Sequence, residues 1–265
     1  MKVSNRIAFT CFIAALYCVA CDLPHEPGPQ PSNIIDTPFE PGLNILGILR
    51  LDDQPGSFFY IERAYQYQEL DTLEFDESFI PIIDDATVTV LGIGETTVDT
   101  FTFEVDTLRG QVYANHDFTP VAREQYALTI THNELDTLTD TTLVPVKPAI
   151  ESISVDTVAQ TVSFQLLTTA DTYLYDVYLI SASDSIRYRF VNYEGDGELP
   201  IYFNTTNAPT EPIEIHIYAY DVNLAEYLTS VITLKPQTYL ELMSTVTGGY
   251  GVFGSVSVFK MELNQ

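Results

Sequence analysis

Cysteine, tryptophan and basic residues are scarce in this 265-residue chain, and each scarcity restricts what the protein can be. The three cysteines, Cys11, Cys18 and Cys21, all lie near the N-terminus, so no disulfide can hold the rest of the chain together. The absence of Trp counts against a sugar-stacking platform. Eleven Lys and Arg oppose 37 Asp and Glu, a net charge of −26, which argues against nucleic acid or anionic lipid as partners because both require clustered cations.

Long apolar runs are also missing. The longest candidate, residues 7–16, is shorter than the roughly 20 apolar residues that a transmembrane helix needs. It follows the basic residues Lys2 and Arg6 and precedes the small residue Ala20, an order typical of a secretory signal peptide. We therefore expect residues 1–20 to be a cleaved leader, which leaves Cys21 as the only thiol of the mature chain.

The segment Cys18-Val19-Ala20-Cys21 resembles the lipobox of bacterial lipoproteins, in which the final Cys is acylated and becomes N-terminal after cleavage. Cys18 stands where that motif usually has Leu. The resemblance implies lipidation at Cys21 and a stable membrane anchor in the cell envelope, with the outer membrane favoured. The alternative is an ordinary leader that happens to end beside a cysteine.

Proline is concentrated in one segment, residues 21–41, which holds six of the 15 prolines of the chain. Proline-rich sequence without an apolar periodicity is typical of a stiff, extended linker. This segment therefore predicts a tether between the lipidated Cys21 and the body of the protein.

From residue 42 onward, short apolar runs alternate with turn residues, the pattern of a β protein. Val146-Lys147-Pro148 separates two such sets and predicts domains at 42–147 and 148–265. One helix is predicted after Asp221, where Leu224, Leu228, Val231 and Ile232 recur at helical spacing until Pro236. The fold class is all-β with one short helix: two Ig-like or prealbumin-like β-sandwich domains in tandem. Predicted strands are 43–51, 58–67, 86–91, 126–131, 150–155, 158–167, 173–180, 187–193 and 213–220.

No pattern in the chain predicts catalysis or a cofactor. His116, His132 and His216 lack a second His at ligand spacing, and no phosphate-binding loop, dinucleotide fingerprint or serine elbow occurs. His216 lies beside Glu214 on one strand face, which is more typical of a solvated surface than of a site. We expect no enzyme, and a hydrolase assembled from scattered acids remains the alternative.

Calcium is the one metal that the sequence suggests. Glu194, Asp196 and Glu198 alternate with Gly195 and Gly197, and such an acidic loop offers the hard oxygen ligands that Ca²⁺ prefers. The spacing differs from that of an EF-hand loop. A polar hairpin turn between Tyr193 and Ile201 is the favoured interpretation.

The C-terminal segment 246–255 combines four glycines with aromatic residues, which indicates close backbone approach or a bulged strand capping the second domain. With Cys21, the turn at 52–56 and the segments 84–90, 126–130 and 144–145, it resembles a Bacteroidetes-type lipoprotein family known only as a domain of unknown function. Members are typically encoded near TonB-dependent outer-membrane receptors. The resemblance implies an accessory or binding role beside such a transporter. A structural or adhesive surface module with calcium-stiffened loops is the alternative.

Overall fold

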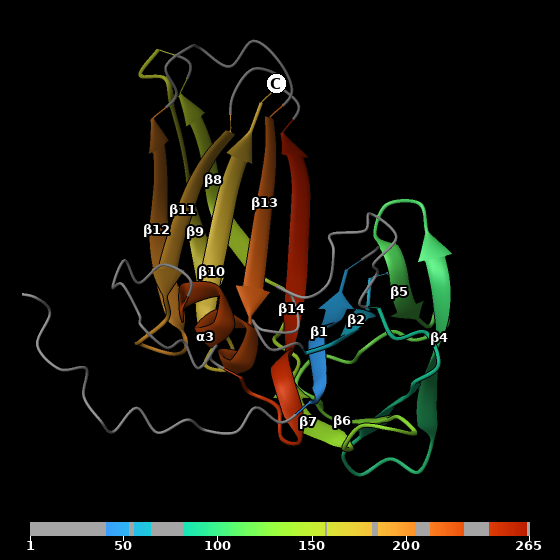
Figure 1. Cartoon of the computed structure of the whole chain (residues 1–265). Helices are drawn as coiled ribbons and strands as arrows, with labels where there is room; N and C mark the ends of the chain where they lie inside the picture. Colours follow the sequence, from blue (N-terminus) through green and yellow to red (C-terminus); the bar gives the residue numbers. More distant parts are fainter. Residues whose placement is uncertain are drawn as a thin grey trace, which may run out of the picture. The chain divides into compact units, whose positions relative to one another are not determined.

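The structure is a computed structural model that describes residues 41–52, 56–64, 82–156, 158–181, 185–204, 213–230 and 244–263 (Figure 1). These residues form β-strands and one short helix, which confirms the predicted fold class. No helix in these ranges is long and apolar enough to cross a membrane.

The elements are β1 (Leu43–Leu51), β2 (Phe58–Arg63), β3 (Thr87–Gly92), β4 (Val98–Asp106), β5 (Gly110–Ala114), β6 (Gln125–Thr131), β7 (Leu138–Leu143), β8 (Ala149–Asp156), β9 (Thr161–Thr168), β10 (Leu174–Ile180), β11 (Ser185–Val191), β12 (Gly197–Asn204), β13 (Ile213–Tyr220), α3 (Val222–Ser230) and β14 (Gly249–Leu263).

The first sandwich is built from β1 to β7. β1, β2 and β5 lie in one sheet, and β3, β6 and β7 form the facing layer, while β4 pairs with β3 through its first half and with β5 through its second. Apolar side chains at alternate positions of both layers meet in one core. On β6 the buried residues are Tyr126, Leu128 and Ile130, as the alternation of the sequence predicts.

The second sandwich packs the three-stranded sheet β12-β9-β8 against strands β11-β10-β13-β14, which are the first four strands of an 11-stranded sheet that continues through β1 into the first sandwich. Its core takes one residue in two from β9, β10 and β13, including Phe164, Val177 and Ile217. The alternate residues of β10 and β13 therefore lie on the opposite, outward side of their sheet, and this outward side carries the candidate site described below.

β14 belongs to both sandwiches. Its residues 249–257 run parallel to β1, and its residues 256–263 pair antiparallel with β13. The glycines permit this approach, since a Cβ at Gly251, where φ is +102°, would overlap the carbonyl oxygen of Ile45. The predicted close backbone approach is thus confirmed, but the segment joins the first sandwich as well as closing the second.

The helix α3 begins where the sequence predicts, directly after Asp221. The Asp221 carboxylate caps it by accepting a hydrogen bond from the Leu224 backbone N–H at 3.0 Å. Leu224 packs on Val256 and Val258 of β14, so the helix covers one end of the sheet. Val231, Ile232 and Pro236, the later part of the predicted pattern, lie outside the described residues, as do the leader, Cys21 and residues 21–40 of the tether.

One local prediction is wrong. Residues 193–201 do not form a hairpin turn, because β11 and β12 on either side belong to different sheets. The intervening segment carries the chain from one layer of the second sandwich to the other. The sequence pattern could not distinguish these two connections, since both require polar residues and glycine.

Candidate functional site

The outward side of the sheet β11-β10-β13 combines two arginines, a buried acid and three tyrosines. β10 contributes Asp176 and Tyr178, and these lie directly opposite Arg189 and Arg187 of β11. On the other flank, Tyr218 of β13 lies opposite Asp176. We call the set of Asp176, Tyr178, Arg187, Arg189, Tyr218 and Tyr220 the arginine–tyrosine face.

Asp176 organises this face. Its side chain is fully buried, and both of its carboxylate oxygens accept hydrogen bonds from both arginines. Arg187 donates from Nε at 3.0 Å and from Nη2 at 2.7 Å, and Arg189 donates from Nε at 2.8 Å and from Nη2 at 2.7 Å. Two side-on forks on one carboxylate fix both guanidinium groups in position.

The ionisation of Asp176 follows from these contacts. Burial alone would raise the pKa of the carboxyl, but the hydrogen bonds and charges of Arg189 and Arg187 outweigh burial and lower the pKa below its usual value. The hydrogen bonds to Asp176 in turn raise the pKa of both guanidinium groups. One negative and two positive charges therefore meet here, which leaves one cation in excess.

The tyrosines extend the arginine pair into a continuous aromatic surface. Tyr178 and Tyr218 contact edge to face with ring centroids 5.7 Å apart, and Tyr218 stacks on Tyr220 at 6.3 Å. The Arg187 guanidinium carbon lies 5.5 Å from the centroid of the Tyr178 ring. Burial, followed by the negative charge of Asp176, raises the pKa of Tyr220, so its hydroxyl stays neutral and can donate.

The two arginines differ in accessibility. The Arg189 side chain is 22% exposed, and its Nη1 also points to the carbonyl oxygen of Leu228 in α3 at 3.5 Å. The Arg187 side chain is 41% exposed and uses only its Nε and Nη2 on Asp176. A guanidinium carries five N–H donors, so the outer edge of Arg187 keeps donors for a ligand.

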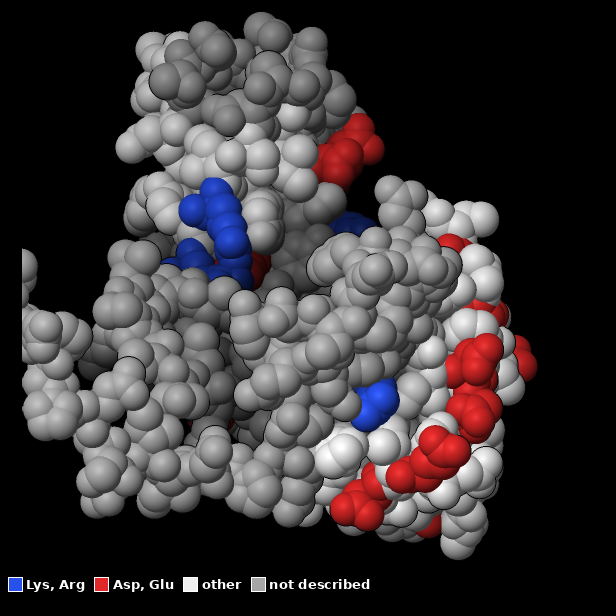
Figure 2. All heavy atoms as spheres, in the orientation of Figure 1, with Lys and Arg blue, Asp and Glu red and all other residues white. Residues whose placement is uncertain are grey.

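This face is unusual for so acidic a chain. Of the eleven Lys and Arg residues, Arg50 and Lys260 join Arg187 and Arg189 on the same side of the sheet, since Arg50 is in register with Val256 and Lys260 lies opposite His216. Figure 2 shows cationic side chains gathered over the second sandwich and a band of acids along the first. Arg50 is ion-paired with Asp52 at 2.6 Å, and Glu214 and Glu262 lie on the same side of the sheet as Lys260, so the excess positive charge is confined to the Arg187–Arg189 pair.

The arrangement is suited to binding a carboxylate or a similar planar anion, and it contains no nucleophile paired with a base. A purely structural role is the competing explanation, in which the ions only join β10 to β11. A single arginine in a side-on fork would satisfy Asp176 for that purpose. The second, more exposed arginine is the observation that favours a ligand.

The sequence-predicted calcium ligands Glu194, Asp196 and Glu198 are all exposed. Asp196 Oδ1 accepts a hydrogen bond from the Ala170 backbone N–H at 2.8 Å, which gives it a structural role in the loop. Throughout the described ranges, no three His, Cys, Asp or Glu side chains are placed to share a metal ion. The structure therefore does not assemble these acids into a binding group.

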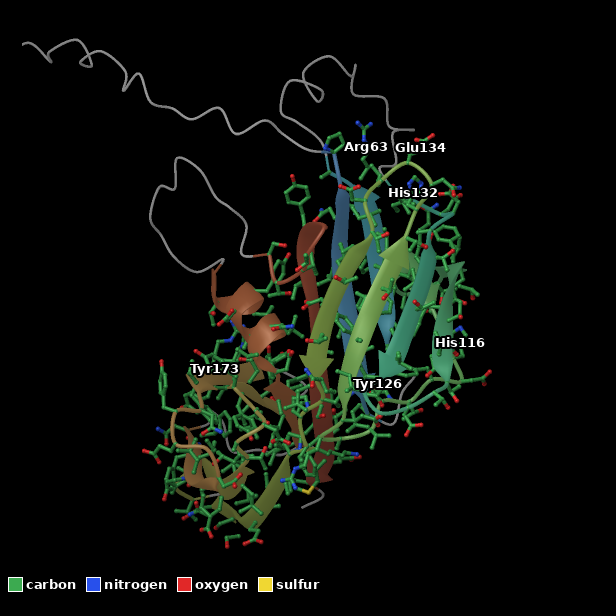
Figure 3. All side chains as sticks on the ribbon, turned by 90° about the horizontal axis from the view of Figure 1, so that it is seen from below. Arg63, His116, Tyr126, His132, Glu134 and Tyr173 are labelled. Atoms are coloured by element: carbon green, nitrogen blue, oxygen red, sulfur yellow. The ribbon has the colours of Figure 1, made fainter. Side chains whose placement is uncertain are left out.

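Each described histidine pairs with one carboxylate. His116 Nε2 lies 3.0 Å from Glu104, His132 Nε2 lies 3.1 Å from Asp85, and His216 Nε2 lies 2.7 Å from Glu214. Figure 3 shows His116 and His132 at separate places on the first sandwich. The proximity of His216 to Glu214, which the sequence predicts, is confirmed, and the histidines do not gather into one site.

A hollow lies at the end of the first sandwich, where Figure 3 labels Tyr126. It encloses about 290 Å³ and is lined by four acids, Glu95, Asp99, Asp117 and Glu124. Burial raises the pKa of Tyr126 to about 12, and its hydroxyl donates to Glu124 at 3.2 Å. No cation from the described chain lines this hollow, and nothing else in it points to a particular ligand.

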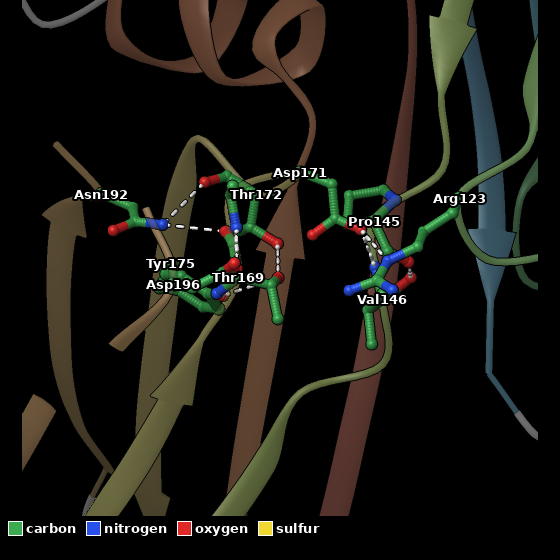
Figure 4. Close-up of polar contacts among 11 residues, drawn as sticks. Arg123, Pro145, Val146, Thr169, Asp171, Thr172, Tyr175, Asn192 and Asp196 are labelled. Atoms are coloured by element: carbon green, nitrogen blue, oxygen red, sulfur yellow. Dashed lines mark hydrogen bonds and ion pairs between the residues drawn. The ribbon is translucent and has the colours of Figure 1, made fainter. Parts of the chain in front are cut away.

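A group of hydrogen bonds around Asp171 links the two sandwiches (Figure 4). Asp171 Oδ2 accepts from Arg123 Nε at 3.4 Å and from the Val146 backbone N–H at 3.3 Å. Next to it, the Asn192 side-chain amide donates to the carbonyl oxygens of Thr169 and Thr172. These bonds fix the turn between β9 and β10, and thereby the start of the strand that carries Asp176.

Comparison with known proteins adds little to this geometry. No family model matches the chain, and no curated protein matches it. Among solved structures, the chain is similar to the FN1–FN3 domains of chicken CNTN1, with 14% sequence identity, a TM-score of 0.26, and coverage of 85% of this chain and 67% of that one. A TM-score this low carries no argument, so the candidate site depends on the geometry alone.

Sequence reasoning did not identify the arginine–tyrosine face. The signal was present in part, because the predicted strand 187–193 has Arg187 and Arg189 two residues apart, and the predicted strand 173–180 has one charged residue, Asp176, within apolar sequence. What the sequence could not show is that these two strands are adjacent and in the register that places Asp176 opposite Arg189. The pairing of β10 with β11 is the missing information.

Proposed function

We propose that this chain is a lipid-anchored cell-envelope protein that binds a partner, without catalysis, through the arginine–tyrosine face. The observation that carries the proposal is the excess cation at Asp176, where two arginines are held by four hydrogen bonds and Arg187 remains 41% exposed. Exposed arginine beside tyrosine is the composition typical of binding hot spots.

The sequence supports the location and the partner in this proposal. The leader pattern and the lipobox-like Cys21 support an anchor in the outer membrane, and the proline-rich segment supports a tether that holds the binding domains away from the bilayer. The family resemblance supports an accessory role beside a TonB-dependent transporter. On this proposal, the transporter or a protein bound to it is the partner.

Site-specific photo-cross-linking in cells tests this proposal. A benzoylphenylalanine replaces Tyr178 on the face, and a matched control replaces Tyr202, which is 62% exposed on β12 in the opposite sheet. We expect position 178, and not position 202, to cross-link an outer-membrane receptor identified by mass spectrometry. Equal yields from both positions, or no product at either, would contradict the proposal.

The anchor is tested separately by membrane fractionation and metabolic labelling with an alkyne fatty acid. Wild-type protein should carry the label and sediment with membranes, whereas Cys21→Ala should lose both properties. Membrane association and labelling that persist in Cys21→Ala would show that the anchor lies elsewhere.

A further inference from the structure

We propose that the paired strands β1 and β14 form a mechanical clamp, which carries tension in shear between the N-terminal tether and the second sandwich. This inference rests on the proposed function, in which the tether leads to the membrane and a partner is held on the arginine–tyrosine face. A protein held at both places is stretched whenever the partner moves relative to the membrane. Three features of the structure carry the inference: the direction of the pairing, the place of the two strands in the chain, and the cover over their hydrogen bonds.

β1 and β14 are parallel, and the direction of a load decides how such a pair of strands separates. Leu43 lies opposite Gly249 at one end of the ladder, and Leu51 lies opposite Ser257 at the other. The tether pulls on β1 from the Leu43 end. The second sandwich holds β14 beyond the other end, where residues 256–263 pair with β13 (Figure 1). The two pulls are therefore opposed and run along the strands, so the interstrand hydrogen bonds share the load instead of opening one after another.

The ladder is also the shortest route for force through the molecule. Along the chain, force that enters at β1 reaches β8 only after passing through β2 to β7, the rest of the first sandwich. β14 bypasses this route, because β13, β14 and β1 are consecutive strands of one sheet. The strands β2 to β7 therefore remain unloaded as long as the ladder holds.

Both faces of the ladder are covered by packed side chains. On one face, Leu43, Ile45 and Phe253 belong to the core of the first sandwich. On the other face, Gly254 lies so close to α3 that an added Cβ would come within 2.6 Å of the Leu224 Cβ. Backbone hydrogen bonds open readily where they are exposed to solvent and few apolar contacts surround them. The cover on both faces therefore opposes the opening of this ladder under load.

Single-molecule force spectroscopy on purified residues 21–265 tests the clamp. Cys21 is the only cysteine in this range, so its thiol accepts one DNA handle, and an introduced cysteine at an exposed position accepts the second. Lys260→Cys places the second handle on β14 beyond the far end of the ladder, whereas Ser244→Cys places it before the start of β14. The first geometry loads the ladder in shear, and the second peels it open from the end where the tether enters. Circular dichroism verifies that both variants are folded.

We expect a several-fold higher rupture force with handles at 21 and 260 than with handles at 21 and 244, because hydrogen bonds that share a load must break together. Forced unfolding is governed by the unfolding rate, so this difference reports the barrier along each pulling direction. In the 21–260 geometry, Gly251→Ala should lower the rupture force, since its Cβ would overlap the Ile45 carbonyl oxygen. Gly94→Ala, at a similar φ between β3 and β4, should leave the force unchanged. If Gly251→Ala does not fold, the comparison of the two handle geometries still decides.

Three results would overturn the inference: equal rupture forces in the two geometries, an unchanged force in folded Gly251→Ala, or a low-force extension of the first sandwich before the main rupture. These measurements require neither the lipid nor a partner. If cross-linking at position 178 succeeds while the forces are equal, the clamp is wrong and the proposed function stands. If the forces differ but cross-linking fails, the ladder resists shear, but its role between membrane and partner is overturned together with the proposed function.

Discussion

At the scale of single residues, Asp176 contributes both to the stability of the fold and to the positioning of the arginines of the candidate site. Its carboxylate is fully buried and depends on Arg187 and Arg189 for its charge balance. Removing one partner of a buried ionic group leaves the others uncompensated, and this costs more than the interaction itself is worth. Removal of Asp176 should therefore destabilise the fold more than removal of Arg187.

We predict that Asp176→Ala lowers the free energy of unfolding by about 1.5–3 kcal/mol, because Arg189, whose side chain is 22% exposed, loses its charged hydrogen bonds. Arg187→Gln should lower it by only about 1 kcal/mol, since that side chain is 41% exposed and Arg189 keeps its bonds. Urea denaturation at pH 7 measures both values. Similar losses in the two variants would contradict the view that Arg187 is in excess of structural need.

The pH dependence of this triad follows from the direction of the shift. The pKa of Asp176 is lower in the folded state than its ordinary value of 3.8. Its contribution is therefore fully present above that ordinary pKa and is lost as the pH falls through the lowered one. Acid titration of wild type against Asp176→Asn should show the difference in stability shrinking below about pH 4. A difference that is constant down to pH 2 would exclude this linkage.

At the same scale, a substitution of Gly251 tests how closely β14 packs on β1. Its φ is +102°, and an added Cβ would overlap the Ile45 carbonyl oxygen. Gly94 has a similar φ of +105° with nothing within 4 Å, and so it is a matched control for backbone strain alone. We expect Gly94→Ala to cost about 1 kcal/mol and Gly251→Ala several times more. Equal shifts in melting temperature would show that β14 does not pack this closely on β1.

At the scale of the elements, Asp221 connects a helix to two strands. Its carboxylate caps α3, accepts from the Ser255 backbone N–H of β14 at 3.0 Å, and accepts from the Thr142 hydroxyl of β7 at 2.6 Å. Burial raises its pKa to about 6, although these hydrogen bonds oppose the rise. The ionised form is therefore the costly one in the folded state.

The sign of this effect is opposite to that at Asp176. A folded pKa above the ordinary value means that the folded protein binds more protons between about pH 4 and pH 6, so stability falls as the pH rises through that window. We predict that Asp221→Asn removes most of this slope. Thermal unfolding at intervals from pH 4 to pH 8 measures it, and an unchanged slope in the variant would assign the pH dependence to other groups.

The elements also show what sequence can predict. β1 and β13 have the predicted bounds, 43–51 and 213–220, because each has one face in a core and alternates accordingly. β4 is absent from the predicted strands because its apolar residues do not mark one buried face: Phe101 is buried, whereas Val98 and Val105 are exposed. The helix start was predictable from Asp221, whose cap is a local interaction. The candidate site was not, because it depends on the pairing of β10 with β11.

At the scale of the whole molecule, β14 makes the two sandwiches interdependent. The predicted boundary between 42–147 and 148–265 does not describe this sharing, since residues 249–257 pair with β1. The core of the first sandwich also includes Val246 and Phe253 from the C-terminal segment. Because β13, β14 and β1 are consecutive strands of one continuous sheet, β14 couples the folding of the two sandwiches.

We therefore predict that residues 42–147 alone do not fold stably, and that a synthetic peptide covering residues 244–258 restores β structure when added in excess. Full-length protein should unfold in one transition. Circular dichroism and tryptic digestion of the fragment, with and without the peptide, measure the effect. A fragment that melts cooperatively without the peptide would contradict the coupling.

The central claim is that an excess arginine on a buried carboxylate makes the outward side of the second sandwich a binding surface. The most direct measurement is the cross-linking yield from position 178 in cells, compared between the wild-type background and Arg187→Gln. The account predicts a strong product in the wild-type background that falls at least several-fold in the variant, while the amount of folded protein stays the same. An undiminished product in Arg187→Gln would contradict it.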